Sequence, residues 1–282
     1  MKVFVFGKTG QVATELSYHK QVTCLARDQA DLNNPQNCAK IIAETDADII
    51  INAAAYTAVD KAEEEEALAT LINGAAVAHM ANAAAARNIP FLHISTDYVF
   101  DGSGTQPWTP NDPVAPLGAY GRSKLVGERA VTAAGGPHAI LRTSWVFSAH
   151  GNNFVKTMLR LGAGRDALNI VNDQIGGPTS AADIAATLMK IAQQFHKGQG
   201  HSGIYHFSGG PAVSWADFAT EVFKQTGLDI NVTGILSSDY PTPAKRPSNS
   251  RMDCSDIEAA FGVSIPDWRK SLTDVLKELG AV

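Results

Sequence analysis

Short apolar runs alternate with longer segments of helical composition along the first half of this 282-residue chain. The near-continuous apolarity of the runs, as in Ile-Ile-Ile-Asn at 49–52, predicts strands buried on both faces. We expect strands at Lys2–Phe6, Val22–Ala26, Asp48–Ile51, Phe91–Ser95, Ala139–Arg142, Leu168–Val171 and Ile204–Phe207. We expect helices at Pro35–Thr45, Ile72–Arg87 and Gly118–Ala134. This alternation predicts an α/β fold with a doubly wound parallel sheet.

The regular alternation ends near residue 144, after which Gly, Pro and Asn become more frequent. A chain of this length is also longer than one compact core needs, so we predict two lobes of unequal size. The larger lobe comprises residues 1–144, and 164–200 returns to it. The smaller, C-terminal lobe comprises 145–163 and 201–282.

Composition excludes several classes of protein. The net charge is −5 and no cluster of Lys and Arg is present, which argues against a nucleic-acid partner. The three cysteines are far apart and form no CxxC pair, which argues against a disulfide framework and a structural zinc site. No segment approaches the roughly 20 apolar residues of a membrane span, and the N-terminal MKVFVFG is too short for a signal-peptide core. We expect a cytoplasmic protein without a membrane partner.

The first predicted strand leads directly into the loop Gly7-Lys8-Thr9-Gly10-Gln11-Val12-Ala13, and a helical pattern follows. In a GxxGxxG loop the first glycine permits a tight turn, and the second lets the backbone approach a pyrophosphate at the helix N-terminus. Ala13 in the third position is small enough for close helix–strand packing. A plain glycine-rich turn is the alternative, but the position between strand and helix favours a Rossmann-type sheet, with 1–144 as a dinucleotide-binding domain. The candidate cofactor-binding residues of the loop are Gly7, Thr9, Gly10, Gln11 and Val12.

Residues at the ends of the next two strands extend this candidate cofactor site. A cation after the second strand favours the 2′-phosphate of NADPH, whereas an acidic residue favours the free hydroxyl of NADH. Arg27 indicates NADPH, Asp28 leaves NADH open, and an exposed arginine at a loop start is an equal alternative. Asp31 and Leu32 are candidates to bracket the adenine. Small residues after the third strand leave room for a flat ligand, and the candidates there are Ala53, Ala54, Ala55 and Thr57.

Tyr120 and Lys124 lie four positions apart on the helix predicted at 118–134, and therefore on one face of it. Such a pair occurs by chance on many helices, so a surface pair is the alternative. The fourth strand, however, ends at Thr96, whose hydroxyl is expected to face the same crevice as the glycine-rich loop. A free tyrosine has a pKa of about 10, and a nearby ammonium favours the phenolate. We predict a proton relay in which Lys124 lowers the pKa of Tyr120 and contacts the nicotinamide ribose.

The glycine-rich loop, the strand-end threonine and the YxxxK pair, in this order, resemble the extended short-chain dehydrogenase/reductase superfamily. Seven segments between residues 6 and 251 more closely resemble the dTDP-4-dehydrorhamnose reductase family: FGKTGQV, NAAAYTAVDKAE, STDYVF, RTSWVF, GNNFVKTMLRL, NDQIGGPT and YPTPAKRPSNSR. The resemblance implies reduction of the C4 ketone of dTDP-4-dehydro-L-rhamnose to dTDP-L-rhamnose with NADPH or NADH.

The resemblance also implies roles for individual residues. Tyr120 would act as general acid on the C4 oxygen and Thr96 would polarise the same carbonyl, both being catalytic together with Lys124. Asn73 matches a superfamily asparagine that supports the relay, and a buried helical asparagine with a backbone partner is the alternative. The candidate substrate-binding residues are Thr96, Asp97, Tyr98, Tyr120, Trp145, Asn153, Arg246 and Arg251.

Three of these substrate-binding candidates have specific alternatives. Trp145 would lie against the deoxysugar or, equally, form part of the core between the lobes. Arg246 and Arg251 are candidate diphosphate ligands, although arginines in a loop are usually surface charges. Together they predict a small substrate-binding lobe for a nucleotide sugar.

Members of this family can dimerise through a magnesium site that includes a glutamate on the first helix. Glu15 occupies that position and is the Mg²⁺ candidate here, but the segment around Asp183 offers fewer carboxylates than such a partner segment needs. A metal-bridged dimer is therefore disfavoured, while a homodimer of another kind stays open. The eight histidines are scattered and form no metal-ligand pair.

Two other functions remain open from the sequence. The first is a nucleotide-sugar epimerase or 4,6-dehydratase of the same superfamily, although a dehydratase typically has an Asp-Glu pair where Asp97 is followed by Tyr98. The second is a non-catalytic regulatory subunit resembling that of methionine adenosyltransferase. The intact Tyr120, Lys124 and Thr96 argue against it.

Overall fold

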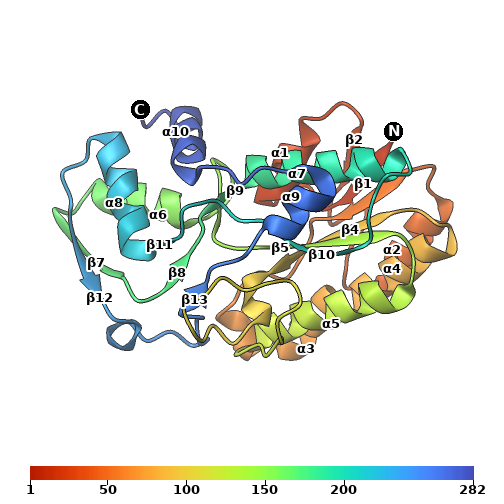
Figure 1. Ribbon diagram of the computed structural model, residues 1–282, viewed down its shortest axis with the longest axis horizontal. Coiled ribbons are helices and arrows are strands. Elements are labelled where there is room, and N and C mark those ends of the chain that lie inside the picture. The colour runs from red at the N-terminus through yellow and green to blue at the C-terminus, as the bar shows by residue number, and fades with distance from the viewer.

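The computed structural model describes residues 1–282 and contains a six-stranded parallel sheet in the spatial order β10-β5-β4-β3-β1-β2 (Figure 1). Its strands are β1 Val3–Phe6, β2 Val22–Leu25, β3 Ile49–Asn52, β4 Phe91–Thr96, β5 His138–Thr143 and β10 Gly203–His206. The chain passes outward from β1 to β2 and then returns to β3 on the other side of β1. Doubly wound folds bind ligands at such a switch point, outside the carboxyl ends of the strands. The predicted fold class is confirmed.

Helices cover both faces of this sheet because alternate strand residues point in opposite directions. Val3 and Val5 pack with one helical layer, and Phe6 packs with the other. The first layer contains α1 Gln11–Ser17, α7 Ala181–His196 and α9 Ser255–Phe261. The second contains α2 Pro35–Glu44, α4 Ala76–Ala86 and α5 Ala119–Ala134, and α3 Glu66–Thr70 precedes α4.

The smaller lobe lies beside the sheet (Figure 1). It has its own apolar core. Phe147, Phe218 and Trp268 are fully buried in it. Its main elements are α6 Phe154–Gly162, α8 Trp215–Thr226, α10 Trp268–Glu278, β7 Ala167–Val171 and β12 Asn231–Ile235. Short strands complete it and join it to the sheet: β6 Val146–Phe147, β8 Ile175–Gly176, β9 Thr179–Ser180, β11 Val213–Ser214 and β13 Asn249–Ser250.

The division between the lobes differs from the predicted one in one helix and two strands. The helix is α9, which was expected in the smaller lobe and packs on the sheet with α1 and α7. Residues 203–206, expected in the smaller lobe, form the edge strand β10 of the main sheet beside β5. Residues 167–171, expected to return to the larger lobe, pair with β12 in the smaller one. Both are short apolar runs, and the composition of a strand does not identify its partner.

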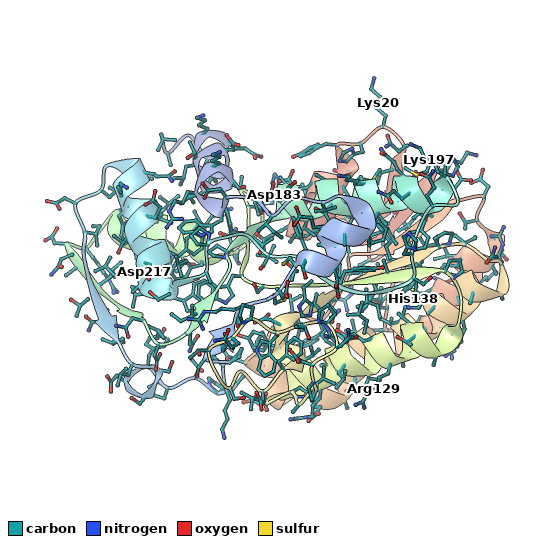
Figure 2. All side chains as sticks on the ribbon, in the orientation of Figure 1. Lys20, Arg129, His138, Asp183, Lys197 and Asp217 are labelled. Carbon is teal, nitrogen blue, oxygen red and sulfur yellow. The ribbon has the colours of Figure 1, made fainter.

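Aspartates in the first turns of two helices help fix the lobes (Figure 2). Asp217 and Ser214 form a capping box at the start of α8. The Asp183 carboxylate accepts hydrogen bonds of 2.6 Å from Ser180 at the start of α7 and from Ser271 on α10, which joins the two lobes. None of the helices is both long and apolar enough to cross a membrane.

Candidate active site

The glycine-rich loop lies at the switch point between β1 and β3. Gly7 has a φ of +112°, which side chains rarely adopt, and a Cβ there would lie 3.3 Å from the carbonyl carbon of Ala53. Gly10 precedes α1, and no side chain caps this helix, so its first backbone N–H groups are free to bind an anion. Thr9 is exposed, whereas Val12 is buried against the sheet. The predicted strand–loop–helix arrangement is present.

The segment after β3 lies beside this loop. The amide oxygen of Asn52 accepts a hydrogen bond of 3.2 Å from Ala54 N, which fixes the first residues of the segment. Ala53, Ala54 and Ala55 are partly exposed and Thr57 is exposed. The segment next to the glycine-rich loop therefore begins with three small side chains.

The residues after β2 divide into exposed and buried ones. Arg27 and Asp31 form an exposed ion pair, with 3.5 Å between Nε and Oδ1. Hydrogen bonds from Asn33, followed by the charge of Arg27, hold the pKa of Asp31 below its usual range. Leu32 is buried in the core with α2 and α4, so its side chain is not available to bracket the adenine as predicted.

Tyr120 and Lys124 lie on the first turns of α5, which follows a long loop after β4. This helix begins where Ala119 N donates to the Glu63 carboxylate at 2.9 Å, a favourable position for a negative charge. Lys124 is only 2% exposed. Its Nζ donates to the Ile94 carbonyl at 2.7 Å and lies 3.3 Å from His93 Nε2, so the ammonium side chain points toward β4.

The carboxyl end of β4 holds a buried polar cluster. Thr96 Oγ1 donates to Asp97 Oδ1 at 3.0 Å and accepts from Tyr98 N at 3.2 Å. The hydroxyl of Ser250, on β13, donates to the other oxygen of Asp97. The ring of Tyr98 meets that of Tyr120 edge to face, with 5.6 Å between centroids. The cluster thus brings together four candidate residues and Ser250, which sequence analysis missed because it is 153 positions away from Asp97.

Burial dominates the electrostatics of this cluster. Burial, followed by the negative charge of Asp97, raises the pKa of Tyr120, and the nearby Thr96 hydroxyl opposes this. Burial also raises the pKa of Asp97 to about 6 and lowers that of Lys124 to about 8. The predicted lowering of the Tyr120 pKa by Lys124 is therefore not found, because Lys124 Nζ is directed at Ile94 and His93. Tyr120 instead stays protonated at neutral pH, as a proton donor requires.

Asn73 lies in a π-helical segment, Leu71–Ala75, that connects α3 to α4. Such segments often occur at functional sites. Its amide accepts from Tyr56 N at 2.8 Å and donates to Tyr56 O at 3.0 Å and Ser123 Oγ at 2.9 Å. Ser123 in turn donates to the carbonyl of Tyr120 at 2.7 Å. Asn73 therefore supports the turn that carries Tyr120, and it has the backbone partners that the alternative interpretation required.

Arg246 is held beside the β4 cluster. Its guanidinium forms an ion pair of 2.7 Å with Asp60 and donates to the Tyr98 hydroxyl at 3.2 Å. It is therefore well placed to meet an anionic ligand next to Tyr120. Asp60 was not predicted, and only its position in the segment VDKAE indicated it.

Three other predicted substrate residues have different surroundings. Trp145 stacks on Trp215 with 3.5 Å between ring centroids, which favours the lobe-core alternative. Asn153 caps α6 and donates to the Gln11 side chain at 3.0 Å, so both residues join the lobes. Arg251, the residue after β13, lines a separate cavity and donates to the Asn249 side chain at 3.0 Å.

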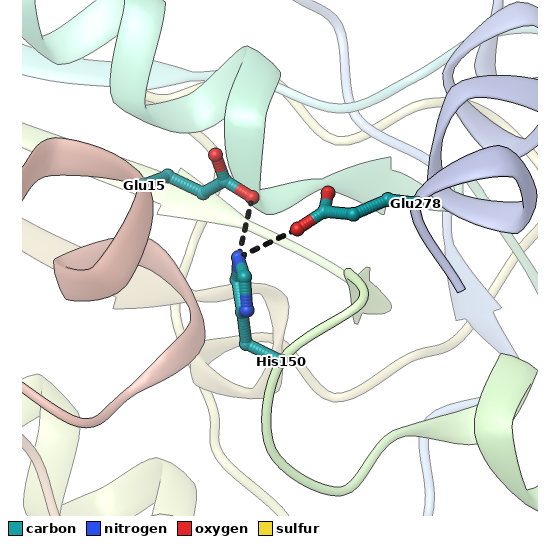
Figure 3. Close-up of side chains that lie close together, drawn as sticks. All are labelled: Glu15, His150 and Glu278. Atoms are coloured by element: carbon teal, nitrogen blue, oxygen red, sulfur yellow. Dashed lines mark ion pairs between the residues drawn. The ribbon is translucent and has the colours of Figure 1, made fainter. Parts of the chain in front are cut away.

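Glu15 belongs to a second group of polar side chains between the lobes (Figure 3). His150 Nε2 lies 3.2 Å from Glu15 on α1 and 3.6 Å from Glu278 on α10. Ligands about 2.1 Å from a tetrahedral metal are about 3.4 Å apart, so this spacing suits a divalent cation. The imidazole favours a transition ion, since Mg²⁺ prefers oxygen ligands. Asp183 is already bonded to Ser180 and Ser271. The group therefore fits Mg²⁺ poorly.

Comparisons with known proteins agree with this site. A family model described as RmlD substrate binding domain matches residues 1–281. The dTDP-4-dehydrorhamnose reductases of Sinorhizobium fredii and Escherichia coli are 45% and 39% identical to the chain, covering 96% and 99% of it and 95% and 98% of their own lengths.

Solved structures give the same result. A dTDP-4-dehydrorhamnose reductase from Clostridium acetobutylicum is 37% identical with a TM-score of 0.93, and the match covers 99% of this chain and 100% of that one. The Bacillus anthracis enzyme, solved in complex with NADP, is 32% identical with a TM-score of 0.92 and the same coverage. With its glycine-rich loop, its threonine at the end of β4 and its YxxxK pair, this chain belongs to the dTDP-4-dehydrorhamnose reductase family of oxidoreductases.

Proposed function

We propose that the protein reduces the C4 ketone of dTDP-4-dehydro-L-rhamnose to dTDP-L-rhamnose, with NADPH as the preferred reductant and NADH as a second one. The observation that carries this proposal is the convergence of Tyr120, Thr96 and Lys124 at the carboxyl end of β4, beside the open glycine-rich loop. The family name and the NADP complex of the Bacillus anthracis relative support it.

The cofactor would lie along the switch point of the sheet. The uncapped N-terminus of α1 suits the pyrophosphate, and Gly7 keeps the loop close to Ala53. Arg27, exposed at the end of β2, is in position for the 2′-phosphate. When bound, NADPH supplies the hydride for C4 of the sugar.

The substrate would lie between this crevice and the smaller lobe. Arg246 offers a positive charge for the diphosphate, held in place by Asp60 and Tyr98. Cys24, Cys38 and Cys254 are unpaired and outside this arrangement, so the proposal needs no thiol chemistry.

Tyr120 donates its phenolic proton to the C4 oxygen as negative charge develops there. Thr96, whose hydroxyl donates to Asp97 in this structure, would reorient to donate to the same oxygen, so that proton donation and hydrogen bonding act on one atom. Lys124, one turn further along α5, would stabilise the phenolate that Tyr120 leaves behind once its Nζ turns from Ile94 and His93 toward the ring. The raised pKa of Tyr120 keeps the proton in place until the substrate oxygen needs it.

Two observations argue against the alternative functions. The Bordetella bronchiseptica enzyme WbmG, solved in complex with NAD, matches with a TM-score of 0.82 but only 17% identity, which shows a shared fold alone. A non-catalytic subunit would have no need to keep Tyr120 near a buried Thr96, with a buried Lys124 one turn further along α5.

The test follows NADPH absorbance with dTDP-4-dehydro-L-rhamnose, for wild type and Tyr120→Phe. We expect one NADPH oxidised per substrate by wild type, and a rate about 10²–10⁴-fold lower for the variant. Tyr205→Phe is a matched control, since that hydroxyl bonds only His201 O, far along the chain from the cluster. Folded wild type that oxidises neither NADPH nor NADH would refute the proposal, and tightly bound cofactor with C4 or C5 inversion would indicate an epimerase.

A further inference from the structure

His93 occupies the centre of a buried polar chain beneath the active site, and no step described so far uses it. It is fully buried on β4, on the face that α5 covers. Its Nδ1 lies 3.1 Å from Asn52 Nδ2 and its Nε2 lies 3.3 Å from Lys124 Nζ. The imidazole therefore connects Asn52, at the end of β3, to Lys124 of the YxxxK pair.

The hydrogen-bond partners of Asn52 fix the position of the imidazole proton. Asn52 Oδ1 accepts from Ala54 N at 3.2 Å, so its NH₂ group is the part that faces His93. An NH₂ group only donates, and His93 Nδ1 must therefore accept. Burial, followed by the charge of Lys124, lowers the pKa of His93, so the ring is neutral. A neutral ring that accepts at Nδ1 carries its proton on Nε2.

This tautomer directs an N–H group at Lys124. An ammonium group has three donors and no acceptor, so charged Lys124 would place two donors face to face. A neutral amine has a lone pair that accepts the Nε2 proton. The hydrogen bond from Lys124 Nζ to the Ile94 carbonyl can form in either state. The buried chain therefore stabilises the amine relative to the ammonium.

We propose that His93, oriented by Asn52, is a positioning residue that sets the charge of Lys124 by donating a hydrogen bond from its Nε2–H to the uncharged amine. The effect on turnover rests on the proposed function, whereas the tautomer itself does not. Burial acts in the same direction and lowers the pKa of Lys124 to about 8. The Glu128 carboxylate, one turn further along α5 and paired with Arg142 on β5, opposes it.

The arrangement has a chemical purpose. Tyr120 loses one proton in each turnover and must regain it, and proton transfer is most effective between groups whose pKa lies near the working pH. A lysine with an ordinary pKa of about 10.4 would hold its proton too tightly for this exchange. Lys124 still supplies its positive charge below its own pKa, so activity should fall as the pH rises through that value.

The first experiment needs no variant. Nitrogen-15 NMR of histidine-labelled protein, recorded without cofactor or substrate above pH 8 where Lys124 is the amine, distinguishes the two tautomers of each neutral ring. We expect His93, assigned by its loss in His93→Phe, to show a protonated Nε2 and an unprotonated Nδ1. The reverse pattern would overturn the inference even in a fully active enzyme.

The second experiment measures kcat/KM against pH. His93→Phe removes the donor, and Asn52→Asp replaces the amide donor with a carboxylate that accepts the Nδ1 proton and frees Nε2 to accept from Lys124. In both variants we expect the fall of kcat/KM at alkaline pH to occur about one pH unit higher than in wild type. Phe91→Leu, which disturbs packing beside the same ring, should leave it unchanged.

The two experiments separate failures of the two proposals. An active wild type whose alkaline limb stays in place in both folded variants would overturn the role of His93. If wild type does not oxidise NADPH at all, the proposed function fails, and the NMR pattern still decides the tautomer.

Discussion

The six-stranded sheet and the smaller lobe contribute to the candidate site in different ways. In the sheet, the functional groups follow strands whose order fixes their position: Gly7 follows β1, Ala53 follows β3, and Thr96 ends β4. In the smaller lobe, the groups near the site arrive from distant segments, as Ser250 does when it bonds Asp97, and as Arg246 does when it pairs with Asp60. Strand order therefore fixes the positions of the functional groups in the sheet, whereas tertiary packing fixes those contributed by the smaller lobe.

The two regions also differ in what they bury. The sheet region buries an ion pair, Arg142 and Glu128, each 2% exposed, together with His93 and Asn73. The smaller lobe buries mainly apolar side chains, including the rings of Phe147, Phe218 and Trp268. Buried polar groups require all their partners, whereas apolar cores of suitable volume tolerate change. The sheet region should therefore be the more sensitive to a single polar substitution.

The largest expected effect tests this contrast directly. Glu128→Gln removes the charge that pairs with Arg142 through two hydrogen bonds of 2.7 and 2.9 Å. We expect the free energy of unfolding to fall by about 3–5 kcal/mol, because the guanidinium stays buried without its carboxylate. Asp274→Asn breaks an exposed pair in the smaller lobe, at 4.0 Å from Lys277, and should change it by less than about 0.5 kcal/mol. Denaturant unfolding of both variants measures the two changes in unfolding free energy. Equal changes would show that the sheet region is no more sensitive to a polar substitution than the smaller lobe.

Asp97 lies where the two regions meet, and replacing its carboxylate by an amide should stabilise the folded protein at neutral pH. Burial raises its pKa to about 6, so between pH 4 and 6 the folded state binds more protons than the unfolded state. Stability from this group is present at low pH and is lost as the pH rises through 6. We expect Asp97→Asn to raise the free energy of unfolding by about 1–3 kcal/mol at pH 7, with little change at pH 4.

The measurement is denaturant unfolding of wild type and Asp97→Asn at both pH values. Ser250→Ala is the matched control, since it removes a hydrogen bond to the Asp97 carboxylate and should destabilise the protein at pH 7. Destabilisation of Asp97→Asn at pH 7 would show that its hydrogen bonds outweigh burial.

Gly7→Ala should affect the sheet region through its backbone. The φ of +112° and the 3.3 Å contact of a Cβ with Ala53 predict a cost of about 1–3 kcal/mol in unfolding free energy. The same strain displaces the loop from its place beside β3, so the Kd for NADPH should rise. Gly104→Ala, at a φ of +70° with open space around it, separates backbone strain from contact. Equal costs for the two variants, with unchanged NADPH binding, would show that the contact with Ala53 is unimportant.

These contrasts explain which features the sequence predicted. Strand ends in a doubly wound sheet converge by topology, so Gly7, Thr96, Tyr120 and Lys124 could be placed without coordinates. The pKa of Tyr120 could not, because it depends on burial and on Asp97 rather than on helix spacing. The lobes of residues 167–171 and 203–206 could not be predicted either, because each strand belongs to the lobe of the strand it pairs with in space. Periodicity identifies a strand, but not its neighbour.

The smallest expected effect concerns the group that joins α1 to α10. Glu15, His150 and Glu278 place one nitrogen and two carboxylates within 4.8 Å of one another, and the imidazole should favour Zn²⁺ over Mg²⁺. A cation bound only to the folded state raises unfolding free energy by about 1.4 kcal/mol at ten times its Kd. We expect Zn²⁺ to raise the melting temperature in wild type and not in His150→Ala, while Mg²⁺ changes neither. Stabilisation by Mg²⁺ alone would show that the carboxylates bind without the imidazole. Glu15, His150 and Glu278 bridge the two regions. Stabilisation by Zn²⁺ would therefore also indicate that the smaller lobe is fixed to the sheet by charge as well as by packing.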